Sequence, residues 1–345
     1  MTEQTTEGAV DVVPEQPRVT IAQVARLAGV SPTTVSHVLS GKRIVGATTR
    51  VAVQDAVRTL GYRPNHVARS LRTRRSQMVA VIVPDLTKPY YSVLTRGLAD
   101  ATVGAAYGTY VCNTDGSAER ETGFLQNVLD RGVDGIVLAS VDAVSAAAIS
   151  AADFGTPVVC IGGSIDHPRV DVVTIDEPAG SRAATLHLIG RGAERIGMIQ
   201  GPPESGLLRV EGFFKAMAEA GRSVDESLLA KGDWTRQGGR DAMTALMGLA
   251  APPDAVFCAN DLMAIGAIDV ARELGLRVPA DVAIVGFDDV DAATIVTPAL
   301  TTVRNPAYET GRKAGELLLS RLRGEYRETG RTVVLDCPLV LRESA

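Results

Sequence analysis

The chain is 345 residues long, 46% hydrophobic and carries a net charge of −5; this excludes a disordered protein and exceeds the usual size of a single domain. No apolar run approaches the roughly 20 residues of a membrane-spanning helix, and the four cysteines are too widely spaced for a typical zinc motif or disulfide framework. We therefore expect a cytoplasmic protein of at least two domains, with no membrane contact and no metal.

Charge is distributed unevenly along the chain. Residues 1–17 are acidic and polar and lack the regions of a signal peptide, so a disordered tail is expected. From Arg18 to Arg75, eleven Lys and Arg face one acid, Asp55, so this segment carries +10; because the whole chain carries −5, the remainder carries −15. A basic segment on an acidic body predicts a polyanionic partner for that segment alone.

The basic segment begins with two short helical patterns in "VTIAQVARLAGVSPTTVSHVLSGK". Thr20 and Gln23 form a capping box, and Gly29 ends the first helix. Ser31 caps the second helix, with Pro32 at its first position. The inward apolar positions are expected to be Ile21, Val24, Ala25 and Ala28, then Val35, Val38 and Leu39.

Two short helices joined by a Gly-Val turn are typical of a helix-turn-helix. The second helix presents small polar groups outward, which can reach base edges and phosphates in a major groove. A third helix is expected from about Thr48 to Leu60, with Gly61 as its stop. Any three-helix module with a basic surface would look similar, so this pattern favours DNA binding without establishing it.

From Met78 onward, β-branched runs alternate with amphipathic helices. Near-continuous apolar strands of this kind indicate an α/β fold with parallel sheets covered on both faces, here as two doubly wound lobes with a ligand site between them. The strands are expected at "VAVIVP", "TYVCNT", "GIVLAS", "PVVCIG", "DVVTID", "IGMIQG", "AVFCAN", "VAIVGF" and "LTTVR".

A dinucleotide-dependent enzyme is the first alternative for such a fold. The first strand of the body leads into "VPDLTKPYY", which has no glycine-rich phosphate turn, and "IGGSID" lacks the third glycine of the dinucleotide motif. The four histidines, His37, His66, His167 and His187, belong to no catalytic constellation. We therefore expect no enzymatic activity and no cofactor.

The residues near the strand ends favour binding of a small molecule instead. Aromatic faces pack against sugar or purine rings, and Asp, Asn and Arg give directional hydrogen bonds to hydroxyls. Alternatively, the tyrosines belong to the core and Asp288 caps a turn; Asp261 is expected only to cap its helix. Arg209 is expected to open a helix. The candidate ligand contacts are Tyr90, Tyr91, Arg209, Trp234, Asn260 and Asp288.

The segments "VTIAQVARLAGVSPTTVSHVLSG" and "TTRVAVQDAVRTLGYRPNHVARSLRT" resemble the DNA-binding headpiece of the lactose and galactose (LacI/GalR) repressor family of bacterial regulators. The resemblance runs from Val19 almost to the C-terminus. One departure is Gly46, where the family usually places a capping Ser; Gly caps nearly as well. Another is the loop "GPPESGLLR", which is shorter than is typical, so the reach of Arg209 into the pocket is left open.

This resemblance implies which residues contact DNA. Pro32, Thr33 and His37 match base-reading positions, while other polar residues match positions nearer the backbone. The stretch "NHVARSLRTRR" is expected to be a hinge that orders only on DNA, where Leu71 would open a central base step in the minor groove; alternatively, Leu71 packs against the body. The full expected set is Thr20, Ser31, Pro32, Thr33, Thr34, Ser36, His37, Asn65, Arg69 and Leu71.

The resemblance also implies an organisation: a helix-turn-helix domain at 18–64, a hinge helix at 65–77, and a core at 78–345 similar to periplasmic sugar-binding proteins. Its first lobe is expected at about 78–175 and 304–330, and its second at about 176–303 and 331–345. The implied function is that of a repressor binding palindromic operator DNA as a homodimer. The chain lacks the leucine-rich C-terminal helix of tetrameric members, which favours the dimer.

The implied effector is a small molecule, with a sugar or sugar derivative favoured over a nucleoside or purine. Whether it releases the protein from DNA or strengthens binding is left open. A small-molecule-binding protein with a vestigial headpiece is the remaining alternative.

Overall fold

The computed structural model describes residues 19–41, 43–63, 70, 73, 75–139, 146–163, 165 and 167–345. The chain divides between Arg74 and Arg75 into two compact units, which we call the headpiece and the core. Most of the expected hinge at 65–77 falls outside the described residues. Within the described ranges, no helix combines the length and the apolar character that crossing a bilayer requires.

The headpiece contains the three expected helices, α1 (Ile21–Leu27), α2 (Pro32–Ser40) and α3 (Ala47–Leu60). The capping box is confirmed: Thr20 N donates to Gln23 Oε1 at 2.7 Å, and Gln23 N donates to Thr20 Oγ1 at 3.4 Å. Ser31 caps α2 by accepting from Thr34 N at 3.1 Å. Hydrogen bonds between residues three positions apart therefore determine where α1 and α2 begin.

A small apolar cluster holds the three headpiece helices together. Val24, Val35 and Val53, one from each helix, are fully buried at its centre. The expected inward position of Leu39 is wrong, since that side chain is 39% exposed. It lies in the last turn of α2, close to the left-handed cap Gly41, whereas Val38 packs against the cluster as expected.

The first lobe of the core is a six-stranded parallel sheet in the order β11-β5-β4-β3-β1-β2. Its strands are β1 (Met78–Val83), β2 (Gly108–Asn113), β3 (Gly135–Leu138), β4 (Val158–Ile161), β5 (Val170–Ile175) and β11 (Thr332–Leu335). Its helices are α5 (Pro89–Val103), α6 (Ala118–Asp130), α7 (Ala146–Asp153) and α13 (Ala307–Leu322).

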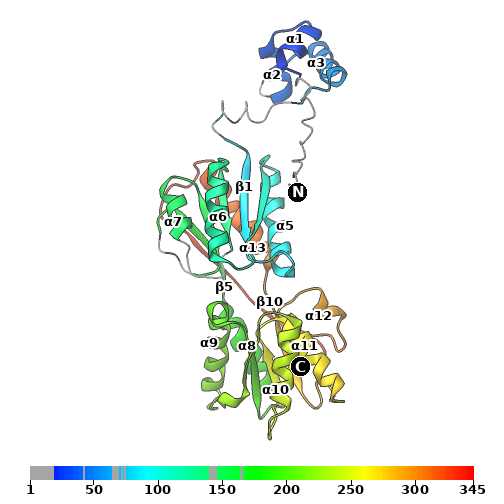
Figure 1. Ribbon diagram of the computed structural model, residues 1–345, viewed down its shortest axis with the longest axis vertical. Coiled ribbons are helices and arrows are strands. Elements are labelled where there is room, and N and C mark those ends of the chain that lie inside the picture. The colour runs from blue at the N-terminus through cyan, green and yellow to red at the C-terminus, as the bar shows by residue number, and fades with distance from the viewer. Residues whose placement is uncertain are drawn as a thin grey trace, which may run out of the picture. The chain divides into compact units, whose positions relative to one another are not determined.

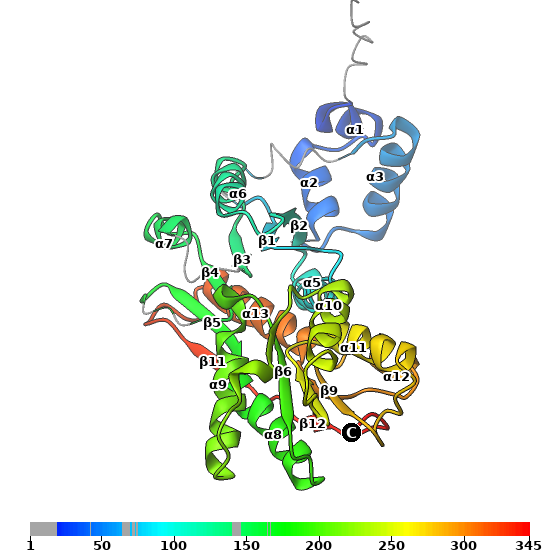
Figure 2. The ribbon, with the colours of Figure 1, turned by 60° about the horizontal axis from the view of Figure 1, so that its bottom comes forward.

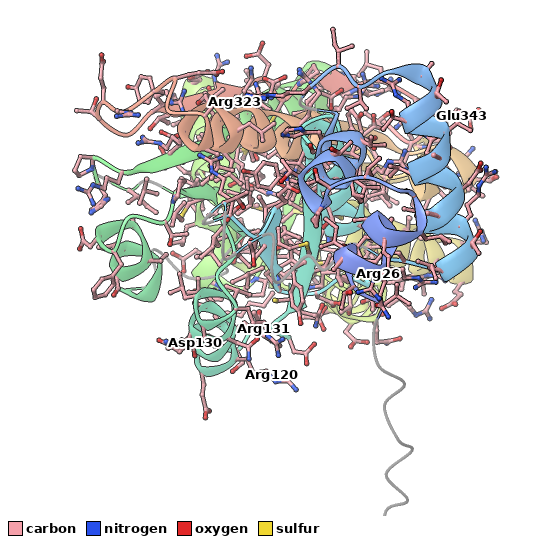
Figure 3. The ribbon with its side chains drawn as sticks, turned by 90° about the horizontal axis from the view of Figure 1, so that it is seen from above. Arg26, Arg120, Asp130, Arg131, Arg323 and Glu343 are labelled. Atoms are coloured by element: carbon pink, nitrogen blue, oxygen red, sulfur yellow. The ribbon has the colours of Figure 1, made fainter. Side chains whose placement is uncertain are left out.

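Alternate residues of β1 serve the two faces of this sheet. Val79, Val81 and Val83 join the cluster under α5 and α13, whereas Ala80 and Ile82 join the cluster under α6 and α7. Figure 1 shows these helix pairs on opposite faces. Arg120, Asp130 and Arg131, at the two ends of α6, are exposed and are labelled in Figure 3. A strand buried on both faces explains the continuous apolar run in the sequence.

The second lobe is another six-stranded sheet, in the order β12-β10-β9-β8-β6-β7, parallel except for β12. Helices α8 and α9 pack together on one face and α10 and α11 on the other (Figure 2). Its strands are β6 (Ile196–Gln200), β7 (Leu229–Lys231), β8 (Ala255–Cys258), β9 (Ala283–Asp288), β10 (Thr301–Arg304) and β12 (Leu339–Val340). Its helices are α8 (Glu177–Gly190), α9 (Pro203–Glu219), α10 (Arg236–Met247), α11 (Asp261–Glu273) and α12 (Ala292–Ile295), with a 3-10 turn at Glu226–Leu228.

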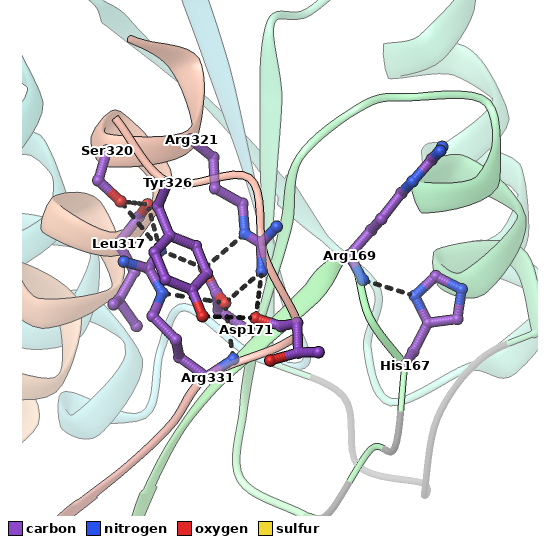
Figure 4. A network of polar contacts seen from close by, with 9 residues as sticks. His167, Arg169, Asp171, Leu317, Ser320, Arg321, Tyr326 and Arg331 are labelled. Atoms are coloured by element: carbon purple, nitrogen blue, oxygen red, sulfur yellow. Dashed lines mark hydrogen bonds and ion pairs between the residues drawn. The ribbon is translucent and has the colours of Figure 1, made fainter. Parts of the chain in front are cut away.

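The assignment of residues 331–345 to the second lobe needs correction. Strand β11 pairs in parallel with β5 of the first sheet, so the chain enters the second lobe only after Leu335. The cause is a buried ion cluster: Asp171 of β5 accepts from Arg321 Nε at 2.8 Å and from Arg331 Nη2 at 2.6 Å (Figure 4). Burial raises the pKa of Asp171, but the bonds from both arginines outweigh it, so its pKa is lowered.

Three segments therefore join the lobes. They connect β5 to α8, β10 to α13, and β11 to β12. Each passes the carboxyl end of a strand, which is where ligands bind in open α/β sheets.

Candidate functional site

A cleft of about 760 Å³ opens at the carboxyl ends of the strands and is lined from both lobes of the core. Its volume lies within the range of about 300–1,000 Å³ that is usual for small-molecule sites. All six predicted contact residues, Tyr90, Tyr91, Arg209, Trp234, Asn260 and Asp288, line this one cleft. Selecting polar and aromatic residues near strand ends thus identified residues that are far apart in sequence but line the same cleft.

Arg209 is the most enclosed charged group in the cleft wall. The prediction that Arg209 opens a helix is wrong. Helix α9 begins at Pro203, and Arg209 lies in its second turn. Arg209 as a whole is only 8% exposed. Nε donates to Glu177 Oε1 at 2.9 Å, Nη1 donates to the Ala259 carbonyl, and Nη2 lies 3.5 Å from Asp288 Oδ1. The guanidinium is thereby held in one orientation from several sides.

Aromatic rings flank the same guanidinium. Its carbon lies 3.8 Å from the ring centre of Phe287 and 5.2 Å from that of Trp234. Trp234 adopts a φ of +66°, which is unusual for a bulky residue. Gly201 leaves room for the indole ring, because a Cβ there would overlap it. Backbone strain of this kind accumulates at functional sites, which marks Trp234 independently of its chemistry.

Asn260, and not Asp261, caps helix α11. Asn260 is the cap of α11, accepting from Met263 N at 2.9 Å, and its amide nitrogen donates to the Trp234 carbonyl at 3.2 Å. The prediction that Asp261 caps this helix is wrong, because the helix already begins at that residue. Asp261 is instead buried, accepting from Thr302 Oγ1 at 2.5 Å and Val290 N at 2.9 Å. Burial raises its pKa well above the ordinary value.

Asp288 ends β9 with a φ of +120°, a second strained position in the wall. Burial raises its pKa, and Arg209 opposes this shift. Tyr90 and Tyr91 lie in the first turn of α5, with ring centres 5.1 Å apart in an edge-to-face arrangement. Burial raises the pKa of both, that of Tyr91 to about 12, so their hydroxyls stay protonated at neutral pH.

Among the lining residues that were not predicted, two contact the predicted ones. Glu177 is the first residue of α8, and its carboxylate holds Arg209. Asn305 follows β10; it is 7% exposed, its nitrogen donates to Asp288 Oδ1 at 3.3 Å, and its Oδ1 accepts no hydrogen bond from any described residue. Both follow strand ends, so the rule that found the other six could have found them. A buried acceptor without a partner is unusual, which marks this position in the cleft wall.

Among the charged residues that line the cleft, within the described part of the chain, the acidic ones predominate. Five carry carboxyl groups and two carry cationic groups: Asp85, Asp115, Glu177, Asp233 and Asp288 against Lys88 and Arg209. Together with the aromatic rings, this wall suits a ligand that offers hydroxyl donors and carries no negative charge of its own.

The headpiece presents its predicted contacts along α2. Ser31, Pro32 and Thr33 are exposed at its N-terminus, and Thr34, Ser36 and His37 are partly exposed. The hydroxyls of Ser31 and Thr34 lie 2.9 Å apart and hydrogen-bond, and Ser31 also caps α2. Thr20 is exposed at the start of α1. Asn65, Arg69 and Leu71 lie outside the described residues.

Comparison with known proteins matches both units. Residues 20–65 match the family "Bacterial regulatory proteins, lacI family", and residues 185–345 match "Periplasmic binding protein-like domain". The chain is 33% identical to the HTH-type transcriptional repressor PurR of Photobacterium profundum, covering 94% of this chain and 98% of the relative. It is 34% identical to the HTH-type transcriptional repressor CytR of Escherichia coli K12, covering 94% and 96%.

Solved structures are similar over nearly the whole chain. The complex of transcriptional regulator CelR with cellobiose is 35% identical, with a TM-score of 0.73, covering 95% of this chain and all of that one. The Lac repressor dimer bound to operator and the anti-inducer ONPF is 26% identical, with a TM-score of 0.84, covering 95% and 99%. The resemblance and the two-lobed fold expected from the sequence are confirmed: the chain belongs to the LacI family of bacterial regulatory proteins.

Proposed function

We propose that this protein is a transcriptional repressor that binds a palindromic operator as a homodimer and that a neutral sugar or sugar derivative in the core cleft controls its affinity for DNA. Membership of the LacI family supports DNA-binding regulation. The observation that carries the effector assignment is the convergence, in one cleft lined from both lobes, of Trp234, Asp288 and Asn305. The protein would act in the cytoplasm, where its operator lies.

The chemistry of the wall favours a sugar. A pyranose or furanose ring presents an apolar face, which the Trp234 ring can cover, and several hydroxyls at its edge. Asp288 accepts from such hydroxyls, and the unsatisfied Oδ1 of Asn305 adds a second acceptor nearby. Cellobiose is bound by the similar regulator CelR. A nucleoside or purine is the second candidate, because the name PurR belongs to a relative and an aromatic wall also stacks bases.

Control of DNA binding would pass through the lobes. A ligand held by groups of both lobes favours a closed cleft, and closure changes the arrangement of the segments that join them. In a dimer, this changes how two headpieces are presented to two half-sites. The direction of the effect, release or tighter binding, is an outcome of experiment.

The test is a mobility-shift titration of the full chain on the DNA upstream of its own gene, with and without a panel of neutral sugars and nucleosides. We expect a defined shifted complex whose affinity changes with at least one compound. Binding without operator preference, at every compound concentration, would instead support the small-molecule-binding protein with a vestigial headpiece.

A further inference from the structure

Glu177 occupies a place from which it can decide what the cleft accepts. It is the first residue of α8, just after the segment that joins the two lobes, and its side chain is 17% exposed. Oε1 receives both Nε of Arg209 at 2.9 Å and Nη2 of Arg209 at 2.8 Å. A single carboxylate oxygen therefore covers the Nε–Nη2 edge of the guanidinium.

That edge is the one an anionic ligand would need. Arginine binds phosphates and carboxylates through two parallel N–H donors in a planar fork. On Arg209, the Nη1 side donates to the Ala259 carbonyl, and the rings of Phe287 and Trp234 flank the guanidinium. The second fork, Nη1–Nη2, already faces the Ala259 carbonyl and Asp288 Oδ1, which lies 3.5 Å from Nη2. The Nε–Nη2 edge is therefore the fork left for a charged ligand group, and Glu177 covers it.

The charge balance leads to the same conclusion. One guanidinium stands between Glu177 and Asp288, so the group carries one negative charge in excess when both carboxylates are ionised. Burial lowers the pKa of Arg209, but the two carboxylates outweigh it and the pKa is raised, so the cation persists at neutral pH. A ligand anion placed here would meet like charges in a poorly solvated wall, where electrostatic repulsion is strong.

We propose that Glu177 is a specificity-determining residue: by covering the anion-binding edge of Arg209 and reversing the local charge, it makes the cleft select neutral, hydroxyl-rich ligands and exclude phosphorylated or carboxylated ones. This inference rests on the proposed function in taking the cleft as the effector site. It extends that function by naming the charge class of the ligand and the residue that sets it.

The test compares Glu177→Gln, which removes only the charge, and Glu177→Ala, which also removes the acceptor, with the wild type. Glu219→Gln is the matched control: Glu219 of α9 pairs with Arg182 of α8 at 2.7 Å, so the same charge is removed between the same two helices but outside the cleft. Trp234 is the only tryptophan of the chain, so its fluorescence reports on the cleft directly.

Inorganic phosphate is the first probe, titrated at constant ionic strength; ribose and ribose 5-phosphate form a second, matched pair. We expect the apparent Kd for phosphate to be at least tenfold lower in both Glu177 variants than in the wild type and Glu219→Gln. For the matched pair, the ratio of the ribose 5-phosphate Kd to the ribose Kd should fall at least tenfold in the Glu177 variants only. Phosphate titrations of the Glu177 variants that match those of the wild type would overturn the proposal.

Two features keep the outcome interpretable. Glu177→Gln preserves the size of the side chain and its place at the start of α8, so it carries the test if Glu177→Ala lowers the unfolding temperature. The proposed function fails separately, if no neutral sugar changes the operator affinity of the wild type. A gain of phosphate binding in the variants would then still establish the role of Glu177 in the cleft.

Discussion

The headpiece and the cleft use arginine in opposite ways. In the headpiece, Arg26, Arg43 and Arg50 are exposed to solvent, a placement that suits long-range attraction of a polyanion. In the cleft, Arg209 is 8% exposed and held by two carboxylates and a carbonyl. Arginine thus supplies a solvent-exposed positive charge in the headpiece and a fixed set of hydrogen-bond donors in the cleft. Binding to DNA and binding to the effector should therefore respond differently to the same perturbations.

The sharpest way to separate the two regions is to unfold one of them. Val35 is fully buried in the small headpiece cluster, so Val35→Asp places a charge in that core and should destabilise the headpiece by about 4 kcal/mol or more. Operator binding should be lost in mobility shifts, while ligand titrations of Trp234 fluorescence stay unchanged. Retained operator binding would refute the assignment of the headpiece as the DNA-binding unit.

The salt dependence of binding should differ almost as strongly between the headpiece and the cleft. If a dimer neutralises six or more phosphates, operator affinity should fall by about 10³ or more between 50 and 200 mM salt, since each contact contributes about −0.9 to the log–log slope. The affinity of the cleft for a neutral ligand should change by less than about threefold over the same range. Operator binding that is insensitive to salt contradicts the role given to the exposed arginines.

Removing the Asp288 side chain should weaken effector binding in the cleft without changing DNA binding by the headpiece. The Asp288→Ala variant loses a buried acceptor beside Arg209 and Asn305, and a hydrogen bond to a charged group contributes about 2 kcal/mol, so effector affinity should fall roughly 30-fold. Operator affinity without effector should stay within about threefold of the wild type. Asp291→Ala, an exposed position on the same loop, is the control. An equal loss in both variants would argue against a direct contact from Asp288.

The smallest change tests the position of the Trp234 ring. A Cβ on Gly201 would overlap the indole, whereas a Cβ on Gly190 would meet nothing within 4 Å. Overpacking of this kind costs about 1–3 kcal/mol, so Gly201→Ala should weaken effector binding about tenfold, measured by calorimetry, and Gly190→Ala should not. Equal affinities in the two variants would show that the ring does not need its observed position.

Prediction from sequence succeeded where the determining contacts are local. The Thr20–Gln23 box, the Ser31 cap and the Gly61 stop each act within a few residues, so their patterns can be read directly. The alternation of strands and helices also predicted two lobes and placed six residues at the strand ends. The role of those residues in binding the effector stays a prediction, as do the DNA contacts of α2 and of Leu71.

The errors and omissions arise from contacts between distant residues. Arg209 meets Glu177 across 32 positions, and Asp171 meets Arg331 across 160. No local pattern indicates either pairing. The position of Glu177 after a strand end could be read from the sequence, but its contact with Arg209 could not, and residues 331–335 were assigned to the wrong lobe. Asp261 shows a subtler limit: both Asn and Asp are good caps, and only the backbone decides that Asn260 precedes the first helical residue.

The central claim is that a ligand in the cleft controls the affinity of the headpiece for DNA, and one measurement tests it directly. The anisotropy of a labelled operator is followed with the full-length protein while Trp234 fluorescence records occupancy of the cleft by the same neutral sugar. We predict that operator affinity changes at least tenfold, in step with the saturation of the Trp234 signal. A sugar that saturates the Trp234 signal but leaves operator affinity unchanged would contradict the account.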